Sequence, residues 1–329
     1  MSAPVDRNLA LELVRVTEAA ALSAARLVGQ GDKEAADQAA VDGMHAVLPT
    51  VHMDGIVVIG EGEKDEAPML HNGEQVGDGQ PPEVDIAVDP LEGTRLAADG
   101  RPNALAVIAL SERGTMFDPG PCVYMEKMAG GEHLADLLDL DRPLQETIGL
   151  VAERKGTDVR DVMVVILDRP RHEEGIQAIR EAGARVRLIP DGDVSGALLA
   201  VSPDRPADLL WGIGGTPEGV ISAAALKCYG GGMIGRLWPR DDDERRRAED
   251  AGYDVSRVLT QDDLVEGDNC FFCATGVTDG DVLEGVRYEG TRGASTESLV
   301  MRSRSGTIRR IQSRHDRDKL RALTGYRYG

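Results

Sequence analysis

The sequence predicts an α/β protein built from layered helices and sheets, and three observations carry this prediction. The first third of the chain has two helix-type apolar patterns followed by short β-rich runs. From about residue 144, strand patterns alternate with helical patterns of about 10–15 residues, which indicates β-α-β units and a mostly parallel sheet. From about Asn269 the chain returns to strand patterns. Its length of 329 residues corresponds to about two domains.

The N-terminal third predicts helices first and strands afterwards. Apolar residues recur at helical spacing from Leu9 to Val28, where Gly29 offers a stop. A second helix is expected from about Lys33 to Leu48, closed by Pro49. The following segments are a strand at 56–59, an acidic loop at 61–66, a Gly- and Pro-rich loop at about 72–82, and strands at 84–88 and 104–110.

The second half predicts strands and helices in alternation. The run 241–247 places acids before bases, which suits the dipole of a solvent-exposed helix. The predicted strands cover 162–167, 186–189 and 209–213, and the predicted helices cover 171–182, 194–201 and 217–229.

Charge and composition exclude several classes of partner. Asp and Glu number 57 against 37 Lys and Arg, a formal net charge of −20. This disfavours a general binder of nucleic acid or of anionic membranes, because both require a positive surface. No apolar run approaches the ~18 residues of a membrane span, and the N-terminus shows no signal-peptide pattern. We therefore expect a cytoplasmic protein.

The cysteines do not form a recognisable framework. The four of them, at 122, 228, 270 and 273, show no disulfide pattern for a chain of this length. Cys270 and Cys273 have the spacing of a zinc or redox pair, but no second Cys or His pair accompanies them. Residues three apart in a strand face opposite sides, so we predict two buried cysteines that point apart.

Carboxylates follow a predicted strand in the run Asp-Pro-Leu-Glu-Gly-Thr. Asp89 and Glu92 stand where α/β folds bind ligands, at the carboxyl edge of the sheet. We expect Pro90 to turn the chain, so that Glu92 comes back beside Asp89. Gly93 allows close backbone approach, and Thr94 stands at an expected helix start that suits a phosphate.

Three further acids complete a candidate metal site. Asp37 lies on the second helix, Glu61 follows the strand at 56–59, and Glu218 stands where a strand gives way to a helix. Carboxylate oxygens suit Mg²⁺ or Mn²⁺, and five carboxylates suffice for two or three ions in phosphoryl transfer. Because any single acid in this chain is more often a solvated surface residue, the hypothesis depends on the set.

The run Asp89–Thr94 resembles the Asp-Pro-(Ile/Leu)-(Asp/Glu)-Gly-Thr signature of the lithium-sensitive, metal-dependent phosphatase superfamily. Further motifs resemble the class II (bacterial) fructose-1,6-bisphosphatases, and the resemblance extends from the first helix to about Arg314. It implies a layered αβαβα sugar-phosphatase fold. The further motifs are Ile59–Glu63, Asp65–Leu70, Tyr124–Lys127, Pro170–His172, Ile189–Val194, Gly212–Gly219 and Thr307–Gln312.

The resemblance also implies residue roles. Thr94 is similar to the family's catalytic threonine. Arg169 stands where some relatives have Lys, which keeps the cation and adds a planar fork. The implied metal ligands are Asp37, Glu61, Asp89, Glu92 and Glu218. The implied substrate contacts are Glu92, Gly93, Thr94, Tyr124, Arg169, Pro170, Arg171, Asp191, Gly192, Asp193 and Gly215.

The implied activity is hydrolysis of the 1-phosphate of fructose-1,6-bisphosphate with Mg²⁺ or Mn²⁺, a step of gluconeogenesis. Arg169 and Arg171 are candidates for binding the phosphate that does not react. Three alternatives stay open: a sedoheptulose-1,7-bisphosphatase or dual enzyme, an inositol-monophosphate-type phosphatase, and a metal-binding regulatory protein without turnover.

The expected organisation has three regions. Residues 1–145 would carry most of the metal site, residues 146–260 would carry sugar recognition and Glu218, and residues 261–329 would pack back on the core. The resemblance implies a homo-oligomer, specifically a tetramer.

Overall fold

The computed structural model describes residues 8–62, 69–202, 207–324 and 327. Part of the acidic loop predicted at 61–66, with Glu63 and with most of the motif Asp65–Leu70, therefore lies outside the described residues. No helix among the described residues is both long enough and apolar enough to span a bilayer.

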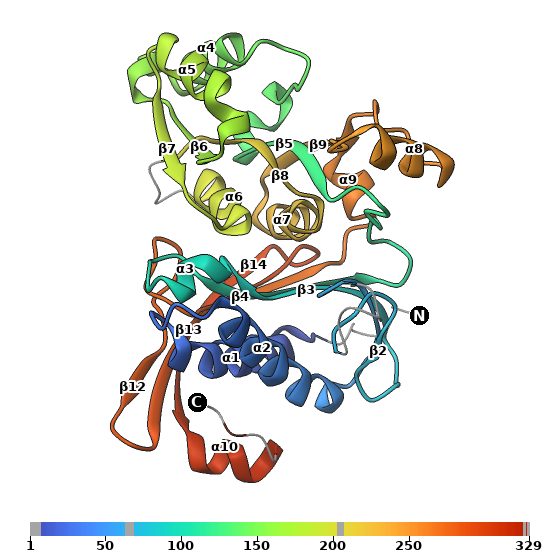
Figure 1. Cartoon of the computed structure of the whole chain (residues 1–329), viewed down its shortest axis with the longest axis vertical. Coiled ribbons are helices and arrows are strands. Elements are labelled where there is room, and N and C mark those ends of the chain that lie inside the picture. The colour runs from blue at the N-terminus through green and yellow to red at the C-terminus, as the bar shows by residue number, and fades with distance from the viewer. Residues whose placement is uncertain (1–7, 63–68, 203–206, 325–326, 328–329) are drawn as a thin grey trace.

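The helices and strands follow one another along the chain in the order shown by colour in Figure 1. The helices are α1 (Ala10–Ala24), α2 (Lys33–Val47), α3 (Thr94–Ala98), α4 (Leu144–Lys155), α5 (Glu173–Glu181), α6 (Asp193–Val201), α7 (Thr216–Tyr229), α8 (Asp242–Asp250), α9 (Gln261–Leu264) and α10 (Arg317–Thr324). Short 3₁₀ helices are η1 (Ala25–Leu27), η2 (Leu48–Thr50), η3 (Glu132–Leu137), η4 (Val159–Asp161) and η5 (Pro170–His172). The strands are β1 (Asp54–Ile59), β2 (Gln75–Val76), β3 (Glu83–Glu92), β4 (Leu105–Glu112), β5 (Tyr124–Gly130), β6 (Met163–Leu167), β7 (Arg185–Ile189), β8 (Leu209–Gly215), β9 (Gly232–Leu237), β10 (Leu259–Thr260), β11 (Phe271–Gly276), β12 (Arg287–Glu289), β13 (Gly293–Arg302) and β14 (Thr307–Asp316).

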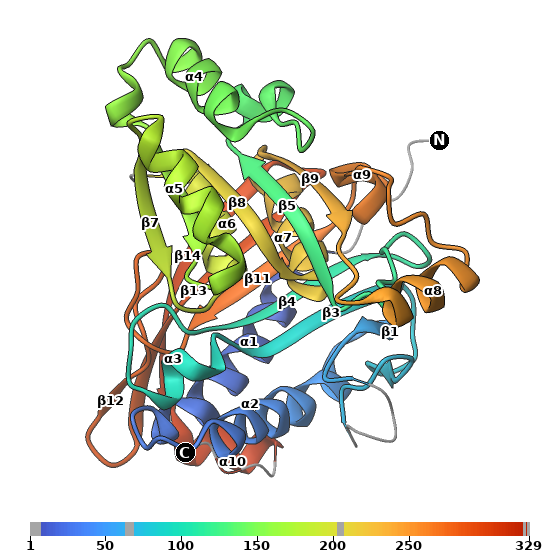
Figure 2. The ribbon, with the colours of Figure 1, turned by 45° about the horizontal axis from the view of Figure 1, so that its top comes forward.

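Two mixed sheets alternate with three layers of helices. The first sheet has the order β12-β13-β11-β4-β3-β1-β2, with β14 paired to β13, and the second has the order β10-β9-β5-β8-β6-β7. Helices α1 and α2 cover the outer face of the first sheet, α6 and α7 lie between the sheets, and α4 and α5 cover the second (Figures 1 and 2). The predicted α/β class is confirmed, and the layers follow the αβαβα order.

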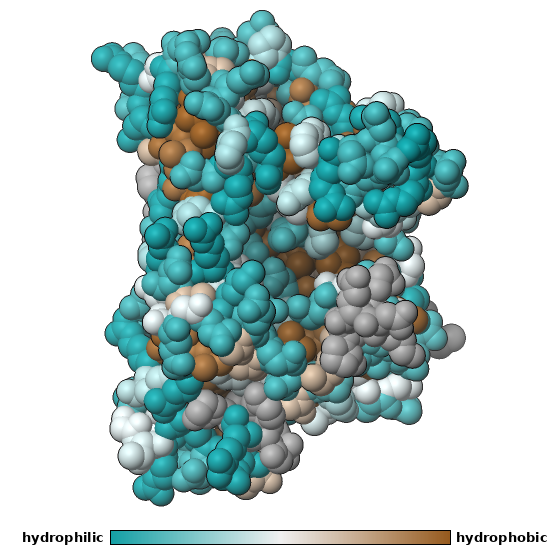
Figure 3. Space-filling view, in the orientation of Figure 1, coloured by the Kyte–Doolittle hydropathy of each residue, from teal (hydrophilic) through white to brown (hydrophobic). Residues whose placement is uncertain are grey.

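Three hydrophobic cores fill the spaces between these layers. One joins α1 and α2 to the first sheet, a second surrounds α6 and α7, and a third lies under α4 and α5. The first pair of helices approaches closely at Gly43, where a Cβ would lie 2.4 Å from the Ser23 hydroxyl. Hydrophilic residues dominate the surface in Figure 3, and hydrophobic side chains show in a hollow between the upper and lower halves.

Most predicted elements are present, but the second sheet is less parallel than predicted. Strands β7, β6 and β8 are parallel, whereas β5, β9 and β10 run antiparallel to their neighbours. The sequence interpretation missed β5 because Glu126 and Lys127 interrupt its apolar residues. It missed β9 because two glycines and Arg236 leave few apolar residues in that strand. Helix α4 was also missed.

The prediction that the chain turns at Pro90 is wrong. Strand β3 continues through Pro90 to Glu92, and its pairing with β4 shifts register between Asp89 and Glu92. Such a bulge adds a residue to one strand and redirects its side chains. The bulge, rather than a turn, therefore brings Asp89 and Glu92 to the same side.

The two cysteines of the C-x-x-C run point apart and are buried, as predicted. The Cys270 thiol lies 3.6 Å from the Sγ of Cys228 on α7. The Cys273 thiol lies 3.2 Å from the hydroxyl of Thr17 on α1. Strand β11, which lies within the first sheet between β4 and β13, therefore packs against α7 on one face and α1 on the other.

Candidate active site

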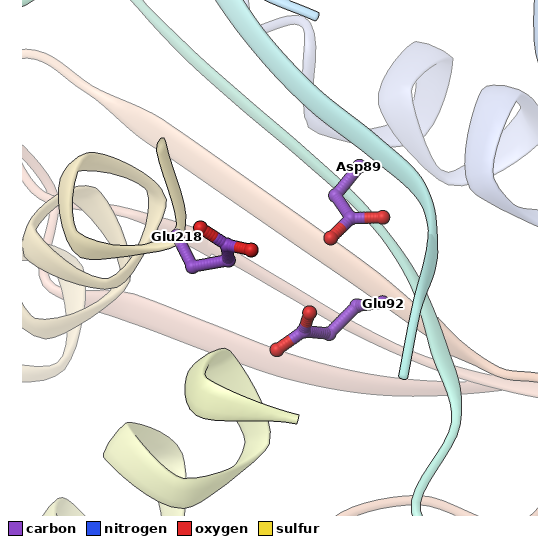
Figure 4. Close-up of side chains that lie close together, drawn as sticks. All are labelled: Asp89, Glu92 and Glu218. Carbon is purple, nitrogen blue, oxygen red and sulfur yellow. The ribbon is translucent and has the colours of Figure 1, made fainter. Parts of the chain in front are cut away.

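Two residues from β3 and one from α7 form a compact group of carboxylates (Figure 4). Asp89, Glu92 and Glu218 each offer an oxygen, and these oxygens lie within 4.8 Å of one another. The bulge in β3 directs the first two, and Glu218 stands in the first turn of α7, where the helix dipole favours a negative charge. Gly93 ends the strand in the left-handed conformation (φ 78°), which lets α3 begin at once.

Burial and mutual repulsion make these carboxylates reluctant to ionise. The pKa of Glu92 is raised to about 8 by burial and by the charge of Glu218. Burial, followed by the charges of Glu92 and Glu218, raises the pKa of Asp89 well above its usual value. Burial also raises the pKa of Glu218, and the Lys127 ammonium opposes that shift.

This carboxylate group fits a divalent cation. Glu218 Oε2 is buried and accepts no hydrogen bond from any described residue. Buried oxygens without donors are costly unless a cation neutralises them. Hard cations such as Mg²⁺ and Mn²⁺ prefer carboxylate oxygens, so the donor set matches them.

Asp37, Glu61 and Thr94 form a second group beside the first. The Thr94 hydroxyl donates to the Leu91 carbonyl at 2.9 Å and lies 3.5 Å from Asp37 Oδ1. Burial, and then the charge of Asp37, raise the pKa of Glu61 to about 7, and burial raises that of Asp37. Glu61 also contributes to the raised pKa of Asp89, which links the two groups electrostatically.

Cationic side chains lie across a cavity of about 300 Å³ from this acidic side. Arg171 donates to the Ile213 carbonyl through Nε at 3.1 Å and Nη2 at 2.8 Å, and its guanidinium lies 4.8 Å from the centre of the Tyr124 ring. Arg169 donates to the Pro190 carbonyl at 2.6 Å and lies 3.5 Å from Asp191 Oδ1. A ligand that carries phosphate at one end suits this side.

The start of α6 connects the two sides of the cavity. Gly192 holds a left-handed conformation (φ 92°) before the helix, and the Val194 N–H donates to Glu92 Oε1 at 2.7 Å. Asp193 forms a buried ion pair with Lys127, with Nζ 2.5 Å from Oδ2. The Lys127 ammonium also donates to the Gly215 carbonyl at 3.0 Å, so it joins β5 to the first turn of α6 and to the N-cap residue of α7.

The structure brings most of the residues named from the sequence to one place. Asp37, Glu61, Asp89, Gly93 and Thr94 are not among the residues that line the cavity, although Asp89 closes its acidic side with Glu92 and Glu218. Pro170 begins η5 between the two arginines but does not line the cavity. The predicted residues that do line it are Glu92, Tyr124, Arg169, Arg171, Asp191, Gly192, Asp193, Gly215 and Glu218.

Sequence reasoning assigned no role to three residues of this site. Lys127 is among the largest fully buried side chains described, and its signal was a lone lysine between Met125 and Met128. Gly214 leaves space for Asp193, because a Cβ there would lie 1.7 Å from its Oδ2. His172 is buried beside Arg171, and nothing in its spacing distinguished it from the other histidines.

Comparisons with known proteins show which family the chain belongs to. Residues 7–315 match the family described as bacterial fructose-1,6-bisphosphatase, glpX-encoded. The chain is 46% identical over 329 residues to a "Fructose-1,6-bisphosphatase class 2" of Haemophilus influenzae, covering 96% of this chain and 98% of that protein. It is also 46% identical to "Fructose-1,6-bisphosphatase 1 class 2" of Escherichia coli K12, covering 95% of this chain and 96% of that protein. With this coverage, the chain belongs to the family of bacterial, class 2 fructose-1,6-bisphosphatases.

Proposed function

We propose that this protein hydrolyses the 1-phosphate of fructose-1,6-bisphosphate to give fructose-6-phosphate and phosphate. The observation that carries the proposal is one cavity with two chemically different sides. Asp89, Glu92 and Glu218 gather at one side, and Arg169, Arg171 and Tyr124 stand at the other. A sugar with two phosphates needs both sides of the cavity, because one phosphate reacts at the carboxylates while the other must be held away from them.

The cofactor of this proposal is Mg²⁺ or Mn²⁺. The ligands would be Asp37, Glu61, Asp89, Glu92 and Glu218. Divalent cations in such sites lower the pKa of water and stabilise the charge that develops on the leaving oxygen. The raised pKa values and the unpartnered Glu218 oxygen support this assignment.

Thr94 is the proposed catalytic residue. Its hydroxyl would orient the attacking water, and the oxygen of Asp37 at 3.5 Å is placed to take the proton onward. A hydroxyl alone is a poor base, so the neighbouring carboxylate is needed for this step. The N–H groups at the start of α3, around Gly93, add a favourable field for the reacting phosphate.

The remaining contacts would select the sugar. Arg169 and Arg171 would hold the phosphate that does not react, Pro170 would shape the loop between them, and Tyr124 would donate to the same phosphate. Asp191 and Asp193 would accept hydrogen bonds from sugar hydroxyls. Gly192 and Gly215 would let the backbone approach the ligand, and Glu92 would contact both the cation and the substrate.

Phosphate release tests this function most directly. Wild type should release phosphate from fructose-1,6-bisphosphate only with Mg²⁺ or Mn²⁺, and Asp89→Asn should abolish the release. Asp250→Asn, at an exposed position of α8, is the matched control and should behave like wild type. Absence of metal-dependent release by wild type would refute the proposal, and full activity of Asp89→Asn would refute the assigned site.

Three further expectations belong to this proposal. The protein would act in the cytoplasm, as a homo-oligomer and specifically a tetramer. Residues 1–145 would supply most of the metal site, residues 146–260 the sugar contacts and Glu218, and residues 261–329 structural support. Light scattering of the purified protein checks the tetramer.

A further inference from the structure

His172 is buried at 1% exposure immediately after the arginine loop, and both of its ring nitrogens are engaged. Nε2 lies 2.8 Å from the Ile213 nitrogen, and Nδ1 lies 2.7 Å from the Leu167 carbonyl oxygen. The Ile213 N–H donates, so Nε2 must accept and Nδ1 must carry the proton that is donated to Leu167. These two contacts fix the imidazole as one neutral tautomer.

The imidazole replaces backbone pairing where β6 and β8 separate. The register pairs of these parallel strands are Val164–Leu209 and Val165–Leu210. Beyond them, the ring of His172 joins the last residue of β6 to Ile213 in β8. Gly212 leaves room for the ring, because a Cβ there would lie 3.1 Å from Nε2.

Ile213 is also the residue that holds Arg171. Its N–H is bound by His172, and its carbonyl accepts both hydrogen bonds from the Arg171 guanidinium. Within the described part of the chain, Nη1 of Arg171 forms no hydrogen bond, and Arg171 lines the cavity beside Tyr124. The position of Ile213 therefore decides where the guanidinium presents its remaining N–H groups.

Electrostatics keep the ring neutral at pH 7. Burial is the main cause that lowers the pKa of His172, and the charges of Arg171 and Arg169 add to it. The Leu167 carbonyl and the charge of Asp193 oppose the shift without cancelling it. A neutral ring is required, because a protonated Nε2 would meet the Ile213 N–H donor to donor.

We propose that His172 is a positioning residue for substrate affinity. Through its hydrogen bond to Ile213, it holds Arg171 where the non-reacting phosphate of the sugar binds. The inference rests on the proposed function for the identity of the ligand. It differs from a purely structural role, which would change stability without a selective change in affinity for that phosphate.

Two substitutions separate the two hydrogen bonds. His172→Asn places an amide near the Nδ1 position, so it keeps the bond to Leu167 and leaves the Ile213 N–H without an acceptor. His172→Gln reaches the Nε2 position with a carbonyl oxygen, so it keeps the bond to Ile213. His133→Asn, at an exposed position in η3, controls for the loss of a histidine.

The test measures binding of fructose-6-phosphate by calorimetry and kinetics with fructose-1,6-bisphosphate. Losing one buried acceptor should raise the Kd and the KM of His172→Asn about tenfold with kcat nearly unchanged. His172→Gln should stay within about threefold of wild type, and His133→Asn should match wild type. In an Arg171→Ala background, His172→Asn should raise the Kd no further, because the two residues act as one unit.

Several results would overturn the inference. One is an equal Kd for wild type and both His172 variants. Another is an equal loss of affinity in His172→Asn and His172→Gln. A third is a loss of affinity from His172→Asn that adds in full to the loss caused by Arg171→Ala. If wild type binds fructose-6-phosphate and the variants show the expected differences in Kd, but wild type does not hydrolyse the bisphosphate, the proposed function fails and the positioning role stands. If wild type neither binds nor hydrolyses, both are refuted.

Discussion

A single methyl group at Gly215 should displace the proposed metal ligand Glu218 without unfolding the protein. The Cβ of an alanine there would lie 1.7 Å from Glu218 Oε2, whereas ordinary contact begins at 3.4 Å. The carboxylate must therefore move by at least about 1.7 Å, a large step for a cluster whose oxygens lie within 4.8 Å of one another. A misplacement of about 1 Å at a reacting centre costs roughly 10²-fold in rate.

The same substitution should cost little stability. Gly215 has φ −62° and ψ 139°, a conformation that alanine adopts without strain. The atom that clashes is the far end of a flexible side chain, which yields more easily than backbone. We expect a change in the free energy of unfolding below about 1 kcal/mol.

The assay for Gly215→Ala is phosphate release from fructose-1,6-bisphosphate over a range of Mn²⁺ concentrations, with thermal unfolding in parallel. The kcat should fall about 10²-fold and the half-activating Mn²⁺ concentration should rise. Gly149→Ala in α4 is the matched control, because a Cβ there meets nothing within 4 Å. The control should keep full activity and gain about 0.5–1 kcal/mol of stability. Wild-type kcat and metal requirement in Gly215→Ala would refute the placement of Glu218.

Three other predictions follow from the site and the core. Because the folded pKa of Glu92 is raised from 4.5 to about 8, the metal-free protein should lose stability as pH rises between these two values, while Mn²⁺ should bind more tightly and release protons. Thermal unfolding and calorimetry at pH 5.5 and 8 check this prediction, and a Mn²⁺ affinity that does not depend on pH would contradict it. Thr94→Ala should lower kcat much more than it changes KM, whereas Thr94→Ser should keep most of the activity. Steady-state kinetics measure both variants, and near-normal turnover of Thr94→Ala would exclude the catalytic role. Phe272→Ala, at a fully buried position of β11, should lower the free energy of unfolding by about 3–5 kcal/mol in urea titrations, and a loss below about 1 kcal/mol would mean that this core collapses around the gap.

The elements that the sequence predicted well are those whose apolar periodicity is uninterrupted. Helix α2 was expected at about 33–48 and spans Lys33–Val47, and β6 was expected at 162–167 and spans Met163–Leu167. Strand β5 was not predicted because Lys127 occupies a buried strand position. Tertiary contacts make this position tolerable, namely the ion pair with Asp193 and the hydrogen bond to the Gly215 carbonyl. The second sheet was expected to be mostly parallel, and this was wrong because β5 and β9, which were not predicted, add antiparallel pairs to it.

Some residues of the candidate site could be predicted from the sequence, and others could not. Asp89 and Glu92 were identified from a local run, yet their convergence depends on a register shift against β4 that the run does not reveal. His172 and Gly214 owe their importance to Ile213 and Asp193, more than 20 positions away or on another element. In this site, the residues proposed to contact the ligand were recognisable in the sequence more readily than the residues that hold them in place.

The return of the chain's last strands into the first sheet has a consequence for biosynthesis. Helix α1 packs against β11 and β13, and the Thr17 hydroxyl meets the Cys273 thiol across 256 positions of sequence. A ribosome therefore completes α1 long before the strands that cover it exist. Folds dominated by such distant contacts form slowly and expose apolar surface while they wait. A nascent chain stalled before Asn269 would present the apolar face of α1 to chaperones and proteases, so commitment to the native state comes only after β11 and β13 have been synthesised.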